Sequence, residues 1–152
     1  MENAQTPTGA RKFILFTVAG TTYAAPSEQV RHIEMVEDVT GVPNAPAHIE
    51  GVVFSRGQVV PVVNLRVRFG FERAPRDIRT RLVVVETAGR LVGLMADDAR
   101  EFLTIADDAI KPPNASLAGL TGNYIEGIAT LGDRIVLVLD VQDVIGAVPH
   151  AA

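Results

Sequence analysis

The amino-acid sequence predicts a mostly β protein made of two similar halves. Apolar runs rich in β-branched residues alternate with short turns, as on both sides of Arg56-Gly57, which is typical of β-hairpins. Residues 48–70 and 124–146 also align without a gap, and their Glu-Gly pairs coincide, which indicates an internal duplication. We expect about five short strands in each copy, enough to close into a small barrel without open edges.

Local signals define the elements of the first half. Pro26 suits the first position of a helical turn, and Asn64 suits the N-cap of another. Two prolines and a glycine mark residues 37–47 as a loop. The expected order is strand 13–18, return strand 23–25, helical turn 26–29, strand 30–36, loop 37–47, hairpin 48–64 and a helical turn ending at residue 69.

The pattern then restarts in a second half. Residues 71–80 are polar and contain a proline, so they form the expected linker between halves 13–70 and 81–146. The second half should hold strands 81–87 and 91–95, an insertion at 116–122, and a helix 141–145 capped by Asp140 and closed by Gly146 at the C′ position. Residues 1–12 have too little apolar content to order and should form a disordered arm. Residues 147–152 form a short tail.

The composition argues against several classes of function. The 152 residues include no cysteine, which excludes disulfides, thiolate zinc sites and a cysteine nucleophile. A formal net charge of -4 and an aromatic content of 5% argue against nucleic-acid binding. No signal peptide and no apolar run of about 18 residues is visible. We therefore expect a cytoplasmic protein without membrane insertion.

Residues that could carry catalysis are weak candidates. The three histidines, His32, His48 and His150, do not have metal-ligand spacing. The acidic pairs Asp97-Asp98 and Asp107-Asp108 lie in turn-like surroundings, where a solvated face is the simpler interpretation. No nucleophile elbow or phosphate-binding loop occurs. The sequence predicts no catalytic residue, no metal ligand and no cofactor.

Arg56 is the strongest candidate for partner recognition. In the internal comparison it aligns with Gly132, and Gly57 aligns with Asp133, so the turn chemistry changes while the apolar frame is kept. An arginine at a turn tip is well placed for contact, and its fork can bind carboxylates. The alternative is a surface ion pair with an acid such as Glu50, worth under about 1 kcal/mol.

The chain resembles the chemotaxis coupling proteins, the CheW-like domains. In the first half the motif is I-x-G-V-x-x-x-R-G-x-V-V-P-V-V-x-L-R, from Ile49 to Arg66; in the second it is Y-I-x-G-I-A-x-L-G-D-R, from Tyr124. The resemblance covers nearly all of residues 13–145. It implies two SH3-like five-stranded β-barrels that share an apolar junction, with short helices.

The resemblance also implies a function. It predicts a non-catalytic adaptor, without a cofactor, between the regulatory domain of a CheA-type histidine kinase and the cytoplasmic tips of methyl-accepting chemoreceptors, at receptor arrays on the inner face of the membrane. Other CheW-like domains are further candidate partners; nucleic acid is not. The implied protein-binding residues are Val30, His32, Ile33, Phe54, Ser55, Arg56 and Gly57.

Two departures from the family pattern fall within this set. Phe54-Ser55 stands where the family usually has Asn-Leu, and His32 stands where it usually has Glu. Two alternatives therefore stay open. One is a divergent module that binds the kinase or another array component without receptor coupling, and the other is a small-ligand-binding β-barrel.

Overall fold

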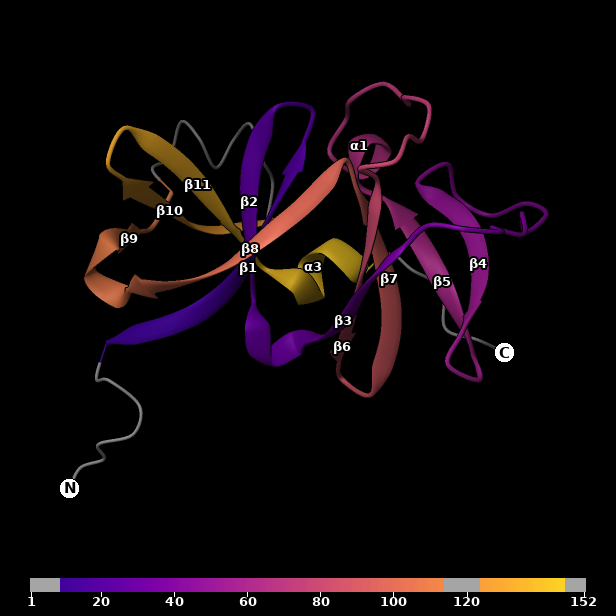
Figure 1. Ribbon diagram of the computed structural model, residues 1–152, viewed down its shortest axis with the longest axis horizontal. Coiled ribbons are helices and arrows are strands. Elements are labelled where there is room, and N and C mark those ends of the chain that lie inside the picture. The colour runs from indigo at the N-terminus through magenta and orange to yellow at the C-terminus, as the bar shows by residue number, and fades with distance from the viewer. Residues whose placement is uncertain (1–8, 114–123, 147–152) are drawn as a thin grey trace.

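The protein consists of two curved β-sheets with short helices between and beside them (Figure 1). The computed structural model describes residues 9–113 and 124–146. The first sheet has the order β8 (Asp98–Ala106), β1 (Ala10–Val18), β2 (Thr21–Pro26), β11 (Arg134–Leu139), β10 (Ile125–Leu131) and β9 (Ile110–Lys111). The second has the order β3 (Val30–Met35), β6 (Arg81–Thr87), β7 (Arg90–Ala96), β5 (Gln58–Asn64) and β4 (Ile49–Ser55).

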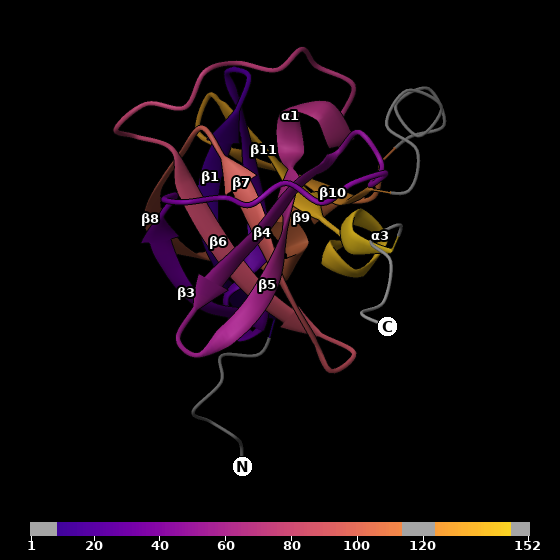
Figure 2. The same cartoon turned by 90° about the vertical axis from the view of Figure 1, so that its right-hand side faces the viewer.

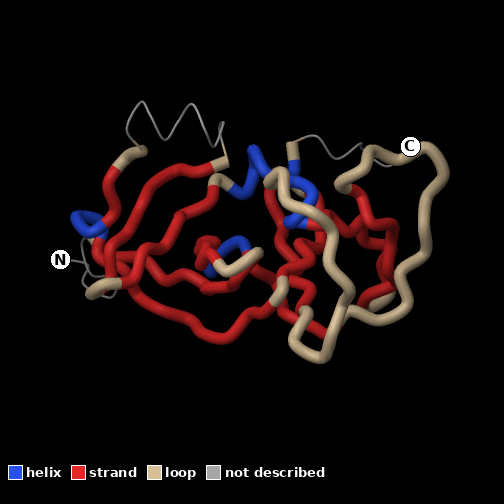
Figure 3. Tube along the Cα trace, turned by 90° about the horizontal axis from the view of Figure 1, so that it is seen from above, coloured by secondary structure: helices blue, strands red, loops and turns tan. Residues whose placement is uncertain are grey.

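These sheets confirm the predicted mostly β fold with two barrel-like units. Seen from above, two strand-rich lobes lie side by side with helical turns between them (Figure 3). The helical segments are η1 (Ser27–Gln29), α1 (Leu65–Arg68), η2 (Asp107–Ala109) and α3 (Val141–Ile145). No helix in the described ranges is long and apolar enough to cross a membrane.

The two sheets do not coincide with the two halves of the sequence. Each sheet contains the N-terminal hairpin of the opposite half: β1–β2 lies with β8, β10 and β11, and β6–β7 lies with β3, β4 and β5. Parallel pairing joins β2 to β11 and β7 to β5. The halves 13–70 and 81–146 therefore describe the duplication and not the folding units, because the hairpins are exchanged.

The exchange preserves an internal two-fold equivalence. The order β8-β1-β2-β11-β10 matches β3-β6-β7-β5-β4 strand for strand. Both terminal hairpins carry a register shift at the same glycine position, Gly51 in β4 and Gly127 in β10. Each position in one sheet can therefore be compared with its equivalent in the other.

Two-residue turns close the hairpins. Ala19-Gly20, Arg56-Gly57 and Ala88-Gly89 all have positive φ at both positions, from +51° to +84°. This is the pattern of type I′ turns, whose twist matches that of the paired strands. The predicted turns at these positions are therefore explained by the geometry of antiparallel pairing.

The apolar core runs continuously from one sheet to the other. The largest cluster combines Ile14 and Phe16 of β1 with Val83 and Leu94 of the second sheet, and α3 adds Ile145. Smaller clusters fill each sheet separately, around Phe13 in the first and Val60 in the second. This shared cluster holds the two lobes together, since separating them would expose it to water.

Both short helices begin at the predicted caps. The Asn64 side chain accepts a hydrogen bond from the Val67 N–H at 3.3 Å, and Asp140 accepts one from the Asp143 N–H at 3.2 Å. Gly146 closes α3 as predicted, but it is the C-cap residue and not the C′ residue, and its φ of -58° is right-handed.

The N-terminal boundary also differs from the prediction. β1 begins at Ala10, and residues 10–12, assigned to the arm, pair with β8. Arg11 fixes this end, because it lies over the Phe13 ring at 5.1 Å and forms ion pairs with Asp107 and Glu126. Residues 1–8, the tail 147–152 and the predicted insertion at 116–122 lie outside the described residues.

Candidate partner-binding site

Arg56 extends from the tip of the β4–β5 hairpin and has no partner among the described residues. Arg56 is exposed to solvent, and no hydrogen bond or ion pair joins its guanidinium group to any other described residue. Glu50, the alternative partner, is occupied elsewhere: Asn64 Nδ2 donates to its Oε1 at 3.1 Å, and Arg73 pairs with the same oxygen. The alternative, a surface pair between Arg56 and Glu50, is therefore not formed, and the cation is available for external contact.

The surroundings of Glu50 keep it charged. Burial by itself would raise the pKa of Glu50, but hydrogen bonds from Asn64 and Arg73, with the charges of Arg73 and Arg76, bring that pKa below its ordinary value. Glu50 therefore serves to fix the start of β4 against the 71–80 loop.

The Arg56-Gly57 turn does not favour an arginine. Arg56 has a φ of +51°, a left-handed conformation that costs a residue with a Cβ atom about 1 kcal/mol or more. The equivalent residue in the second hairpin is Gly132, with a φ of +66°, which carries no such cost. Ala19 and Ala88 have nearly the same φ in the same type of turn, so the strain belongs to the turn and the fold does not require an arginine in it.

Replacing Arg56 by asparagine should therefore stabilise the fold. Asparagine tolerates positive φ, so Arg56→Asn is expected to raise the free energy of unfolding by about 0.5–1 kcal/mol in urea denaturation. Ala88→Asn is the control, because Ala88 has a φ of +53° in the same type of turn. A loss of stability in Arg56→Asn beside a gain in Ala88→Asn would show that the arginine side chain supports the fold.

A groove beside Arg56 gathers four of the predicted contact residues. Val30, His32, Ser55 and Arg56 line this hollow of about 430 Å³, the Arg56 groove, with Glu28, Arg31, Gln58, Val60, Val84 and Leu91. Gly57 belongs to the same turn. Most of the contact residues predicted from the sequence therefore lie in one region of the structure.

Phe54 and Ile33 point away from this groove. Successive side chains of a strand face opposite sides. Phe54, with 75% of its surface exposed, lines a neighbouring groove. Ile33 is half-buried and packs against the central apolar cluster, so its contact with a partner remains a prediction.

The edges of the second sheet meet through side chains. β3 and β4 are its two outer strands, and they cross in the view of Figure 2. Glu34 Oε2 accepts a hydrogen bond from Ser55 Oγ at 2.6 Å and contacts His32 Nε2 at 2.5 Å; His32 Nε2 lies 3.3 Å from Ser55 Oγ. These three residues form a polar seam that joins β3 to β4.

Two of the three equivalent positions in the first sheet are apolar, and the third, which is equivalent to His32, is Glu101. Leu103 is the equivalent of Glu34. Glu34 pairs with Leu82 of β6, and Leu103 pairs with Phe13 of β1, which is the equivalent of Leu82. Ser55 corresponds to Leu131, which flanks the equivalent turn. Leu103 and Leu131 both pack against the core of the first sheet. The fold can therefore close without the polar seam.

Comparison with known proteins identifies the family. The family model of the CheW-like domain matches residues 12–148. The chain belongs to the CheW-like domain family. It is 28% identical to the chemotaxis protein CheW of Klebsiella aerogenes, over 92% of this chain and 84% of that protein, and 30% identical to that of Bacillus subtilis, over 93% and 90%.

A solved structure of a CheW-like protein has the same fold. The scaffolding protein TtCheW of Thermoanaerobacter tengcongensis superposes with a TM-score of 0.84 and 25% identity, covering 93% of this chain and 97% of that one. The resemblance inferred from the two motifs is thus confirmed over nearly the whole chain.

Two of the residues that depart from the family pattern, Ser55 and His32, meet at the polar seam of this CheW-like domain. Ser55, where the family usually has Leu, and His32, where it usually has Glu, share the carboxylate of Glu34. The two changes are 23 positions apart in the sequence. Their contact suggests that they act together as one unit of the site.

Four surface residues beside the seam escaped the sequence analysis. Glu34, Met35, Glu37 and Asp38 line the neighbouring groove with Phe54. The internal alignment held the signal, because it places Glu34 on Leu103 and Met35 on Thr104. A polar residue opposite an apolar equivalent marks a position that the fold does not dictate.

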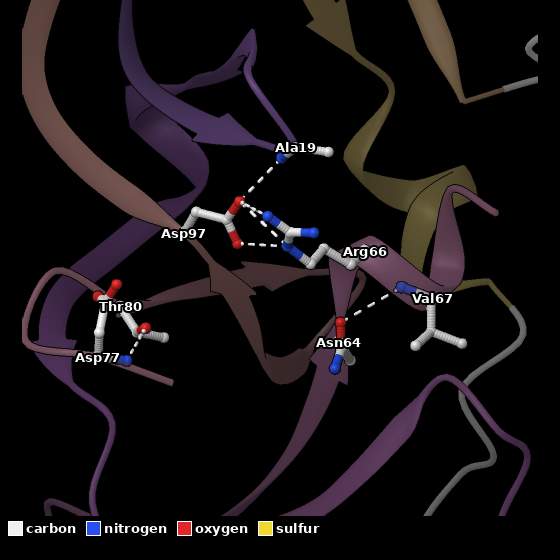
Figure 4. A network of polar contacts seen from close by, with 7 residues as sticks. All are labelled: Ala19, Asn64, Arg66, Val67, Asp77, Thr80 and Asp97. Atoms are coloured by element: carbon white, nitrogen blue, oxygen red, sulfur yellow. Dashed lines mark hydrogen bonds and ion pairs between the residues drawn. The ribbon is translucent and has the colours of Figure 1, made fainter. Parts of the chain in front are cut away.

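A second polar cluster lies at the junction between the sheets of the CheW-like domain (Figure 4). Asp97 Oδ1 and Oδ2 accept hydrogen bonds from Arg66 Nε at 2.9 and 3.1 Å, and Oδ2 accepts two more, from Arg66 Nη2 and the Ala19 N–H, both at 2.8 Å. This arrangement, the junction clamp, ties α1 to the β7–β8 connection and to the β1–β2 turn.

The junction clamp borders a hollow of about 590 Å³. Two pairs of opposite charges lie there: Asp97 pairs with Arg66, and Glu101 with Arg134 at 2.7 Å. Among the described residues, no three His, Asp or Glu side chains gather as a metal site would require. The paired charges suit a structural junction better than a site that binds a charged ligand.

Proposed function

We propose that this CheW-like domain is a non-catalytic adaptor that couples the cytoplasmic tips of methyl-accepting chemoreceptors to the regulatory domain of a CheA-type histidine kinase. The relatives named above are chemotaxis proteins, and the similar solved structure is a scaffolding protein. The place of action is then the cytoplasmic face of a receptor array, with other CheW-like domains as further partners.

Arg56, which pairs with no residue in the part of the chain that the structure describes, supports this proposal most directly. Arginine is enriched at binding hot spots and recognises carboxylates with two parallel hydrogen bonds. Here it occupies a strained turn, faces solvent and borders a groove lined by Val30, His32 and Ser55. A partner that offers a carboxylate beside an apolar side chain would match this surface.

Reversing the charge of Arg56 tests the proposal. Arg56→Glu should weaken binding to the kinase regulatory domain or the receptor tip by roughly thirtyfold or more, which corresponds to about 2 kcal/mol. Its melting temperature should stay close to that of the unmodified protein, since exposed substitutions have small effects. Separate titrations of the two purified fragments measure each affinity.

Lys111→Glu is the control for net charge. Lys111 is exposed on β9 of the other sheet, so the substitution should leave both affinities unchanged. Equal binding by Arg56→Glu and the unmodified protein would remove Arg56 from the site. Binding of the kinase fragment alone would favour the module without receptor coupling, whereas a lack of binding to both fragments would contradict the adaptor role.

A further inference from the structure

A second groove lies on the other side of the polar seam from the Arg56 groove. Its volume is about 440 Å³. Met35 and Phe54, 54% and 75% exposed, flank it with Val53, and Glu34, Glu37 and Asp38 add carboxylates. We call it the acidic groove. The seam forms the wall between the grooves, because Glu34 lines the acidic groove and bonds to Ser55 of the other.

The internal equivalence shows that the fold does not require these side chains. Phe54 pairs with Val59, as the equivalent Thr130 pairs with Ile135. By the register of β3 and β8, Met35 corresponds to Thr104. The exposed apolar side chains Met35 and Phe54 thus stand where the other sheet carries threonine. Selection for an interaction explains the difference better than folding does.

The charges of the groove define what it can bind. Neither Glu37 nor Asp38 has a side-chain hydrogen bond or ion pair with another residue in the described ranges, and all the charged residues that line the groove are acidic. Their field would repel nucleic acid and anionic membrane surfaces and attract cations. Exposed Phe54 and Met35 add an apolar surface of the kind found at the centre of protein interfaces.

We propose that the acidic groove binds a protein segment that carries lysine or arginine beside an apolar side chain. The apolar side chain would cover Phe54 and Met35, and the cation would pair with Glu37 and Asp38. Together with Arg56, the site would then read opposite charges on the two sides of the seam, which fixes the direction of the bound segment. The assignment of this segment to the kinase or the receptor rests on the proposed function. The prediction that the groove binds a cationic and apolar segment does not depend on that function.

A model peptide tests the chemistry without either partner. A short peptide that alternates lysine and leucine is titrated into the ¹⁵N-labelled protein, and a glutamate–leucine peptide serves as its control. Saturable shifts of the Glu37, Asp38 and Phe54 amides with the lysine peptide alone, weakened by salt, are expected. Absence of saturable shifts there, or equal shifts with both peptides, would overturn the proposal.

Exchange of equivalent residues tests the role of the groove in partner binding. The triple variant Met35→Thr, Glu37→Ala and Phe54→Thr introduces the two threonines of the other sheet and removes one carboxylate, all at exposed positions. Its affinity for the kinase fragment or the receptor-tip fragment should fall by at least about tenfold with an unchanged melting temperature. The reverse exchange, Thr104→Met with Thr130→Phe, is the matched control and should bind normally.

The outcomes separate this inference from the proposed function. Normal binding by the triple variant, with weak binding by Arg56→Glu, would overturn the groove and leave the adaptor role intact. A saturable lysine-peptide site in a protein that binds neither fragment would support the groove and contradict the adaptor role.

Discussion

Replacing Gly51 by alanine is expected to destabilise the protein by about 3 kcal/mol or more. A Cβ atom at Gly51 would lie 2.2 Å from the Thr40 carbonyl oxygen and 2.8 Å from its carbonyl carbon, and the φ of Gly51 is +147°. Both clashing atoms belong to the backbone, so a side-chain rotation cannot relieve the contact.

The clash would also break a bridge that covers the edge of β4. The Thr40 N–H donates to the Val52 carbonyl at 2.9 Å, and the Val52 N–H donates to the Thr40 carbonyl at 2.8 Å. Moving Thr40 away would leave these groups without partners. Thermal unfolding should show a decrease of roughly 10 °C in melting temperature.

Gly89→Ala separates the clash from the cost of positive φ. Gly89 has a φ of +76°, and apart from its chain neighbours no atom of the described residues lies within 4 Å of the place that a methyl group would occupy. Only the left-handed backbone is then disfavoured, at about 1 kcal/mol. Equal destabilisation by the two substitutions would show that Thr40 yields easily and that the bridge contributes little.

Asp97→Asn is expected to lower the free energy of unfolding by about 1–2 kcal/mol, because it removes the charge from the bidentate pair with Arg66. The side chains of Arg66 and Asp97 are 27% and 34% exposed, so solvent screens part of their attraction. Asp107→Asn is the control: its pair with Arg11 spans 3.5 Å, and both side chains are more exposed. That change should cost no more than about 0.5 kcal/mol. Equal losses would contradict a special role for the junction clamp.

The junction clamp should also weaken in acid. Burial alone would raise the pKa of Asp97, but hydrogen bonds from Arg66 and the Ala19 N–H, with the Arg66 charge, lower that pKa below its ordinary value. A carboxyl with a lowered folded-state pKa adds stability above its unfolded-state pKa, and this contribution disappears as the pH falls through the folded-state pKa. Urea unfolding across the acidic range should therefore show a smaller decrease for Asp97→Asn than for the unmodified protein. An identical slope would contradict the assignment.

The sequence was sufficient to predict the local structure. Two-residue turns such as Ala88-Gly89, the caps Asn64 and Asp140, and the duplicated hairpins depend on neighbouring residues alone. The hairpin exchange could not be predicted in this way. Because the halves are similar, β5 and β11 offer nearly the same apolar pattern to β2. The pairing of β2 with β11 is therefore visible only in the three-dimensional structure.

The candidate site shows the same division. The exposure of Arg56 follows from its place in a turn, and the sequence was enough to predict it. The contact between His32, Glu34 and Ser55 joins two edge strands that are not paired by backbone hydrogen bonds. The alternation of apolar and polar residues in the sequence therefore cannot predict it. In the sequence, Glu37 and Asp38 have the character of solvated loop residues. Their position beside Phe54 follows only from the fold.

The exchange of hairpins has a consequence for the origin of this chain. One repeat by itself could complete neither sheet, whereas two separate copies could complete both by trading hairpins as a swapped dimer. Fusion through residues 71–80 makes the exchange of hairpins intramolecular, and it raises the effective concentration of each half for the other. The two fragments cut within this linker should therefore fold only when mixed, as expected if the single chain arose from an ancestral pair of identical chains.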